Sequence, residues 1–154
     1  MCSDQGSDYH WMGHALALAE RAAAEGEVPV GAVLVVQGQA VGEGWNRPVA
    51  SHDPTAHAEI VAIRAAAETL GNYRLTGSTI YVTLEPCLMC AGAMLHARVS
   101  RLVFGAPDLK RGAVESTSAA FETPGLNHRL DVSGGVRGDE CAQRLQAFFR
   151  ARRG

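Results

Sequence analysis

The sequence lacks a hydrophobic run long enough to span a bilayer, which takes about 20 consecutive apolar residues. Its best apolar stretch, VPVGAVLVV over residues 28–36, is too short, and the polar start MCSDQGSDYH lacks the apolar segment of a signal peptide. The sequence also lacks a disulfide framework, since it has four cysteines and cytosolic thiols stay reduced. We therefore expect a cytoplasmic protein with no membrane partner.

A large excess of charge of either sign is also missing. The formal net charge is −2, so the overall charge does not indicate a nucleic-acid-binding protein. The distribution is uneven, because residues 1–43 carry one basic residue against six acidic ones, whereas residues 137–154 carry five arginines. Such a local basic patch can bind phosphate, although a solvated helix face has the same composition.

The order of predicted elements indicates an α/β fold in a single domain over residues 1–154. The expected strands cover residues 30–36, 40–45, 79–84 and 99–104, the first two joined by a hairpin turn at QGQ. The expected helices cover residues 9–25, residues 53 or 55 to about 70, residues 87–97, and a basic C-terminal helix within 139–154. We expect residues 1–7 to be disordered, and the glycine-rich segment 105–136 gives no clear pattern. The strand, helix and strand between residues 79 and 104 predict a parallel crossover.

The stretch TLEPCLMC places Cys87 and Cys90 three residues apart, at the start of a helix that Pro86 opens. At this spacing both sulfurs lie on one helix face. The unsatisfied N–H groups of a helix N-terminus favour thiolate, which metal binding and redox chemistry both need. The pair alone leaves a metal site, a redox pair and two buried cysteines open. A closed structural zinc site would need a second ligand pair at short spacing, which the sequence lacks.

A second segment, DPTAHAEI, adds His57 and Glu59 at the start of another helix. Together with the two cysteines, His57 completes three ligands of the types that Zn²⁺ prefers, and the fourth position is left to water, as in catalytic zinc sites. Glu59 is then available for general acid–base chemistry. Residues two apart lie about 200° apart around a helix. The two side chains therefore converge only if the tip of the helix points at the metal.

The H-x-E motif followed by P-C-x-x-C is the signature of the zinc-dependent nucleobase deaminases. Further stretches spread over most of the chain resemble the bacterial tRNA-specific adenosine deaminase family of the cytidine/deoxycytidylate deaminase superfamily: EVPVGAVLV, GEGWNRP, YVTLEPCLMCAGAM, RLVFGAPDLKRGA, GLNHRL and AFFRARR. The resemblance implies a three-layer α/β/α fold with a mixed five-stranded sheet and one Zn²⁺ per subunit. It also implies a homodimer that converts adenosine to inosine at the wobble position of a tRNA anticodon stem-loop.

The resemblance also implies roles for individual residues. Glu59 would carry a proton from the zinc-activated water to the adenine ring and then to the departing amine. Asn46, Val30, Ala58 and Pro86 would surround the base and ribose, and Asp108 would contact the preceding nucleotide. Asn46 and Asp108 could instead cap turns of their own loops. Further RNA contacts are expected from Lys110, the single lysine, and from the C-terminal residues Phe149, Arg150, Arg152 and Arg153. Glu85 is expected to be structural, and no role is assigned to His52, His128 or Cys141.

Two other functions fit the same motif. The first is a deaminase of the same superfamily that acts on a free base or nucleoside, such as cytosine or guanine. The arginine-rich C-terminus argues against it, because a small substrate needs no such surface. The second is a zinc-stabilised binding module without catalysis. It predicts a fourth protein ligand, which the sequence does not offer, and it leaves Glu59 without a purpose.

Overall fold

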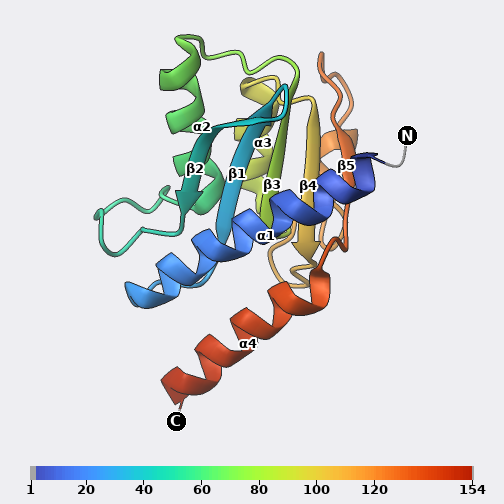
Figure 1. Cartoon of the computed structure of the whole chain (residues 1–154). Helices are drawn as coiled ribbons and strands as arrows, with labels where there is room; N and C mark the ends of the chain where they lie inside the picture. Colours follow the sequence, from blue (N-terminus) through green and yellow to red (C-terminus); the bar gives the residue numbers. More distant parts are fainter. Residues whose placement is uncertain (1–2, 154) are drawn as a thin grey trace.

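The computed structural model describes residues 3–153 and shows a five-stranded sheet with helices on both faces (Figure 1). The strands, in chain order, are β1 (Gly31–Val36), β2 (Gln39–Trp45), β3 (Ser78–Leu84), β4 (Arg101–Ala106) and β5 (Asp131–Ser133). The helices are α1 (Ser3–Ala24), α2 (Ala58–Leu70), α3 (Leu88–His96) and α4 (Gly138–Arg153), with a short 3₁₀ helix, η1 (Ala120–Glu122).

The sheet is mixed and has the strand order β2-β1-β3-β4-β5. Strand β1 is antiparallel to both β2 and β3, whereas β3, β4 and β5 are parallel to one another. Helices α1 and α4 cover one face and α2 and α3 cover the other (Figure 1). The predicted three-layer fold and the parallel crossover from β3 through α3 to β4 are therefore confirmed.

Both faces of the sheet are buried, which explains the continuous apolar character of β1. Alternate residues of a strand point to opposite faces. Leu34 accordingly packs in the core formed with α2 and α3, and its neighbour Val33 packs in the core formed with α1 and α4.

Glycines in β2 bring α2 directly against the sheet. A Cβ atom at Gly42 would lie 2.4 Å from the carbonyl oxygen of Ala62, and one at Gly44 would lie 2.4 Å from that of Ala58. Any larger residue would push the helix outward. The two glycines therefore fix where α2 begins, and this helix start carries the functional residues described below.

The N-terminal helix is longer than the sequence predicted. It begins at Ser3, whereas the sequence predicted a helix from residue 9 and disorder over residues 1–7; residues 1 and 2 lie outside the described part of the chain. Asp8 explains the difference, because its buried carboxylate accepts hydrogen bonds from the Arg101 guanidinium (2.7 and 2.8 Å) and from the Tyr81 hydroxyl (3.0 Å). These contacts tie the start of α1 to β3 and β4. None of the helices described is both long and apolar enough to cross a membrane.

Two further predictions differ from the structure. Helix α2 starts at Ala58 rather than near Asp53, because the Asp53 carboxylate accepts hydrogen bonds from the backbone and hydroxyl of Thr55 in a separate turn. The family resemblance implied a fifth strand, but the sequence pattern did not place β5 at Asp131–Ser133. It has three residues and pairs with β4 alone at the edge of the sheet, so its own sequence has too little alternation to reveal it.

Candidate active site

The candidate site lies where two helices begin. His57 occupies the N-cap position of α2, and Cys87 occupies that of α3. Both residues have extended backbones, and neither side chain bonds back to its own helix, as N-cap side chains usually do. Both side chains are instead available to the space between the two helix starts. Because unpaired N–H groups and the helix dipole make this space electropositive, it favours thiolate.

Three potential metal ligands meet in that space. The Nδ1 atom of His57 lies 3.6 Å from the Cys87 sulfur and 3.5 Å from the Cys90 sulfur, and all three atoms lie within 4.8 Å of one another. A tetrahedral zinc ion with ordinary Zn–N and Zn–S bonds separates such atoms by about 3.6 Å. The donor set and its spacing therefore fit Zn²⁺, and three protein ligands leave the fourth position to water. The ligand types and their spacing therefore confirm the predicted zinc cofactor.

Glu59 lies beside the cluster, in the first turn of α2. Its residue is 4% exposed, and its carboxyl group lies within hydrogen-bonding reach of the Cys90 sulfur. His57 and Glu59 converge because the tip of α2 faces the cluster. Two residues at positions i and i+2 of a helix can meet only in this arrangement. Burial raises the pKa of Glu59 to about 7. A carboxyl group that titrates near neutral pH can both accept and donate a proton.

The two cysteines are hydrogen-bonded to each other, and this contact shifts their pKa values in opposite directions. A hydrogen bond from Cys90 lowers the pKa of the Cys87 thiol, and the same hydrogen bond, together with burial, raises the pKa of Cys90. The contact with Cys87 also raises the pKa of His57. These shifts favour the thiolate at Cys87, and a cation that binds the cluster displaces the protons that the other ligands hold.

Glu85 turns its carboxylate to a neighbouring loop. It accepts hydrogen bonds from backbone N–H groups of residues 108 and 114–116 and from the Ser116 hydroxyl. Burial alone would raise the pKa of Glu85, but the hydrogen bonds from Ser116, Glu115 and Asp108 hold it below its usual value. Glu85 is thus ionised and structural, as expected from the sequence.

A pocket of about 700 Å³ opens over the cluster. The structure brings most of the residues predicted from the sequence to this pocket. They are Val30, Asn46, His57, Glu59, Cys87, Asp108, Lys110 and Phe149.

Other predicted residues do not line this pocket. Ala58 and Pro86 are almost completely inaccessible to solvent, and neither is among the residues that line the pocket. Asn46 is also partly used within the protein, since its side-chain oxygen accepts the backbone N–H of Ala58 (2.8 Å). The Asn46 side chain therefore caps the start of α2, 12 residues further along the chain, and not a turn of its own loop as the alternative proposed.

Sequence reasoning missed several residues that line the pocket. Leu109 and Arg111 flank predicted residues in the stretch APDLKRGA, and that neighbourhood was the available signal. Val28, Leu84 and Leu145 carried no signal, because apolar residues in a strand or helix are as easily core.

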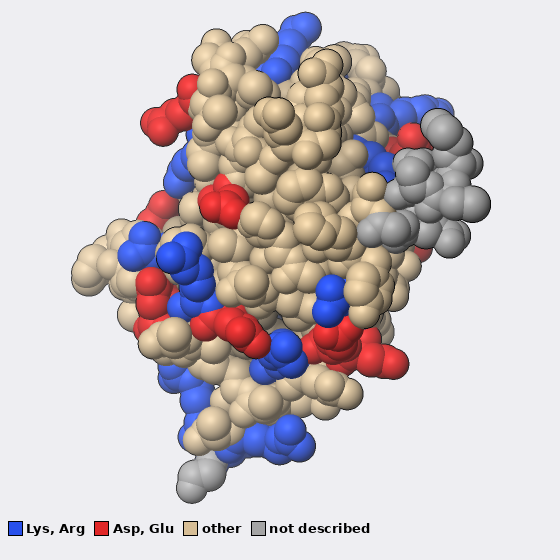
Figure 2. Space-filling view, in the orientation of Figure 1, with Lys and Arg blue, Asp and Glu red and all other residues tan. Residues whose placement is uncertain are grey.

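The C-terminal half of α4 adds a basic surface near the pocket. Phe149 is 43% exposed and lines the pocket, whereas the charges of Arg150, Arg152 and Arg153 follow in the last turn. Figure 2 shows basic side chains around this end of α4, at the bottom of the view. Arg152 is partly used within the protein, because it donates to the Gly26 carbonyl and lies over the Phe148 ring.

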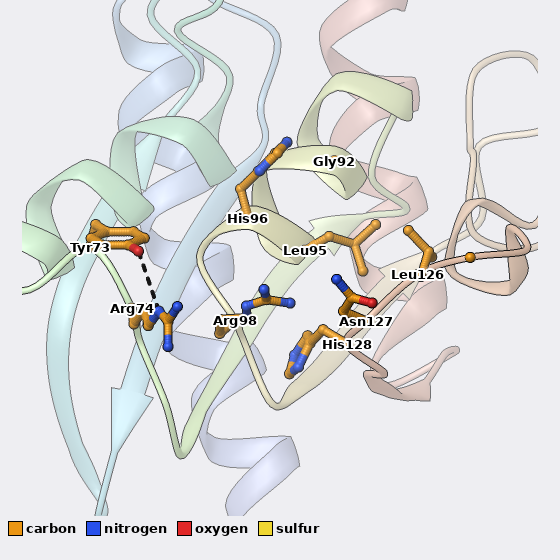
Figure 3. A pocket seen from close by; sticks show the side chains of 10 residues that line it. Tyr73, Arg74, Gly92, Leu95, His96, Arg98, Leu126, Asn127 and His128 are labelled. Atoms are coloured by element: carbon orange, nitrogen blue, oxygen red, sulfur yellow. Dashed lines mark hydrogen bonds between the residues drawn. The ribbon is translucent and has the colours of Figure 1, made fainter.

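A second basic hollow of about 380 Å³ lies at the opposite end of α3 (Figure 3). Arg74 and Arg98 face it, together with Asn127 and His128. Arg98 follows the end of α3 with a left-handed backbone (φ 60°), a conformation that favours glycine. Among the described side chains, which are those of residues 7–153, neither arginine forms an ion pair with a carboxylate, so both charges are available to an anion.

Comparison with known proteins agrees with this geometry. Residues 5–106 match the cytidine and deoxycytidylate deaminase zinc-binding region. The chain is 54% identical to the tRNA-specific adenosine deaminase of Haemophilus influenzae over 147 residues, which cover 95% of this chain and 85% of that protein.

Solved structures show the same relationship. One from a study of A-to-I editing by tRNA:A34 deaminases at the wobble position aligns with a TM-score of 0.86 and 48% identity, covering 88% of this chain and 99% of that one. A guanine deaminase from Nitrosomonas europaea aligns with a TM-score of 0.78 and 25% identity, covering 89% and 81%. The chain therefore belongs to the cytidine and deoxycytidylate deaminase family and, within it, to the tRNA-specific adenosine deaminases.

Proposed function

We propose that the protein converts adenosine to inosine at the wobble position of a tRNA anticodon by hydrolytic deamination. The observation that carries this proposal is the pocket in which a three-ligand metal cluster, a buried carboxyl group and a basic rim occur together. The 54% identity to a tRNA-specific adenosine deaminase supports the choice of substrate.

The chemistry is divided between the metal cluster and Glu59. His57, Cys87 and Cys90 would hold Zn²⁺, which when bound supplies a water with a pKa near neutrality. Glu59 takes a proton from water and delivers it to N1 of the adenine ring, and the hydroxide left behind adds to C6. Glu59 then moves the proton of the new C6 hydroxyl group to the amine, the C6–N bond breaks, and ammonia leaves as the C6 carbonyl of inosine forms. A carboxyl group with a pKa of about 7 suits both directions of transfer.

The remaining pocket residues would hold the nucleotide. The side-chain oxygen of Asn46 is bound to α2, so its amide N–H groups are the part that can meet the base or ribose. Phe149 offers an exposed ring on which a base can stack. Asp108 and Lys110 lie on the opposite loop, where they would contact the flanking nucleotides.

Basic surfaces outside the pocket favour RNA over a free base. Arg150 and Arg153 at the end of α4, and Arg74 and Arg98 in the second hollow, present positive charge away from the metal cluster. A free base could reach none of them, whereas a folded RNA can place phosphates at several sites. Each neutralised phosphate would also make binding more sensitive to salt.

A homodimer and a cytoplasmic location are part of the same proposal. Helix α3 exposes Leu88 (68%) and Met89 (37%) next to the metal cluster. Adjacent exposed apolar side chains of this kind are common where a second subunit binds. The cytoplasm is where such an enzyme would meet tRNA. Sedimentation at several protein concentrations would test the dimer directly.

The decisive experiment offers RNA and small substrates in parallel. The purified zinc protein is incubated with an anticodon stem-loop that carries a wobble adenosine, and inosine is scored. Free adenosine, cytosine and guanine are tested beside it, together with a stem-loop whose adenosine is moved one position. Inosine at the wobble position alone supports the proposal. Turnover of a free base without RNA activity would instead assign the protein to the small-molecule deaminases.

A further inference from the structure

A buried carboxylate adjoins the metal cluster but bonds to a different segment. Glu85 directly follows the last residue of β3, two residues before Cys87, and it is 2% exposed. Its backbone N–H donates to the Ala106 carbonyl at the end of β4 (2.8 Å). None of the hydrogen bonds of its side chain goes to the metal cluster or to Glu59.

Five donors from one loop converge on this carboxylate. Oε1 accepts the Asp108 N–H (3.1 Å) and the Ser116 hydroxyl. Oε2 accepts the N–H groups of Val114 (3.1 Å), Glu115 (2.8 Å) and Ser116 (3.0 Å). An ionised carboxylate offers about four lone-pair sites, so these donors fill its capacity. Among the described residues, no lysine or arginine pairs with it.

Gly112 shows independently how closely the loop follows the carboxylate. A Cβ atom at this position would lie 2.3 Å from the Glu85 carboxyl carbon and 2.4 Å from Oε1. The backbone of Gly112 in turn donates to the Asp108 carbonyl (2.8 Å), and the next N–H, of Ala113, donates to the Pro86 carbonyl (2.9 Å). The loop is thus folded around the Glu85–Pro86 turn.

The side chains at the tip of this loop face the substrate pocket. Asp108, Leu109, Lys110 and Arg111 all line it. Leu109 is 78% exposed, so apolar packing does not hold the tip in place. The Asp108 carboxylate shapes the tip itself, because it accepts the backbone N–H groups of Lys110 and Arg111 (both 3.1 Å). The five bonds to Glu85 lie at the base of the loop, so the position of this tip relative to the pocket depends on the Glu85 carboxylate.

We propose that Glu85 is a positioning residue for RNA binding, which holds residues 107–116 so that Asp108, Lys110 and Arg111 meet the substrate. The proposal rests on the function proposed above. Without the carboxylate, the loop samples other shapes, and RNA binding must then order it again. This cost weakens binding and leaves the proton transfers of Glu59 intact, because the hydrogen bonds of the Glu85 side chain go to the loop and not to Glu59 or the metal ligands.

The test compares Glu85→Gln with Glu115→Gln. Gln at position 85 keeps the shape but turns N–H donors toward backbone N–H donors. Glu115 is exposed in the same loop, and its substitution keeps the backbone bond to Glu85. For Glu85→Gln we expect KM for the stem-loop to rise at least about tenfold, with kcat within about twofold and zinc content unchanged. Trypsin should cleave after Lys110 or Arg111 at least about tenfold faster, while Glu115→Gln keeps wild-type values throughout.

The two arms separate this proposal from the proposed function. A wild-type protein inactive on the stem-loop would defeat the proposed function, but trypsin cleavage would still show whether Glu85 anchors the loop. Loss of zinc, or a lower kcat at unchanged KM, would place the effect of Glu85 on the metal cluster and overturn the proposal. Wild-type KM and cleavage rates would overturn it too. If Glu85→Gln fails to fold, Ser116→Ala removes a single donor and should shift KM and cleavage in the same direction.

Discussion

Replacing Glu59 by glutamine removes the group that moves protons and keeps its shape. A general acid–base group contributes about 10²–10⁴-fold to rate, so kcat should fall by that factor, or by about 3–5 kcal/mol of barrier. KM should change little, because the side chain is buried at the metal cluster rather than on the rim of the pocket. Zinc should remain bound, since the cluster of three ligands does not include Glu59.

The same substitution has a second consequence for stability. Burial raises the Glu59 pKa from 4.5 to about 7 in the folded, metal-free protein. A shift of this size costs the ionised form about 3 kcal/mol. Below the unfolded pKa of about 4.5, the folded and the unfolded protein both hold the proton, and no stability is lost. As pH rises from that value through the folded pKa of about 7, the stability of the wild type falls. Metal-free Glu59→Gln should therefore be more stable than the wild type at pH 8, by up to about 3 kcal/mol, and nearly equal to it near pH 4.5.

Three measurements check this reasoning, with Glu68→Gln, an exposed position on the same helix, as the matched control. Zinc is quantified in each purified protein, inosine formation is followed in a single turnover, and urea unfolding is compared after chelation at several pH values. Loss of zinc from the Glu59 variant would make Glu59 a ligand. Retained activity would remove it from the proton transfers, and a stability difference that ignores pH would contradict its burial as an ionisable group.

Three further predictions follow from the contacts described. Cys87→Ala should lose most of its zinc and melt at a lower temperature, because two ligands hold the ion less tightly than three; stoichiometric zinc would refute the cluster. The double change Arg150→Glu and Arg153→Glu should weaken stem-loop binding and flatten its salt dependence while zinc stays bound, and unchanged affinity at low salt would exclude the end of α4. Asp8→Asn should lower the free energy of unfolding by about 2 kcal/mol, since it breaks a mostly buried pair with Arg101, and urea unfolding at wild-type stability would contradict this.

The sequence predicted β1, β3 and β4 because each is a run of β-branched or apolar residues between turn residues, and it predicted β2 because a hairpin turn precedes it. It could not predict β5, whose three residues are a strand because β4 lies beside them. The extent of α1 was missed for a similar reason. The segment around Asp8 looks like a polar tail until Arg101, 93 positions away, supplies the partner that holds it.

The metal ligands were predictable because zinc needs particular side chains, and His57, Cys87 and Cys90 are of those types. The substrate pocket was less predictable. Ala58 and Pro86 adjoin metal ligands in the sequence, and the structure buries both. Distance along the chain is therefore a poor guide to which side chains reach the pocket at a helix start, where neighbouring residues point in different directions.

Two buried carboxylates make structural contacts that no sequence motif indicates. Glu85 holds the loop on one side of the pocket, and Glu27, which is 3% exposed, accepts the N–H groups of Val49 (3.3 Å) and Ala50 (2.7 Å) in the loop between β2 and α2. In both loops most of the donors are backbone amides, which every residue except proline supplies. The donor positions therefore tolerate many side chains, so their sequence gives no sign of the contact. The carboxylate that accepts these hydrogen bonds is the residue that cannot be replaced freely. It can be identified only from the fold, which shows that it is buried and that, among the described residues, no lysine or arginine pairs with it.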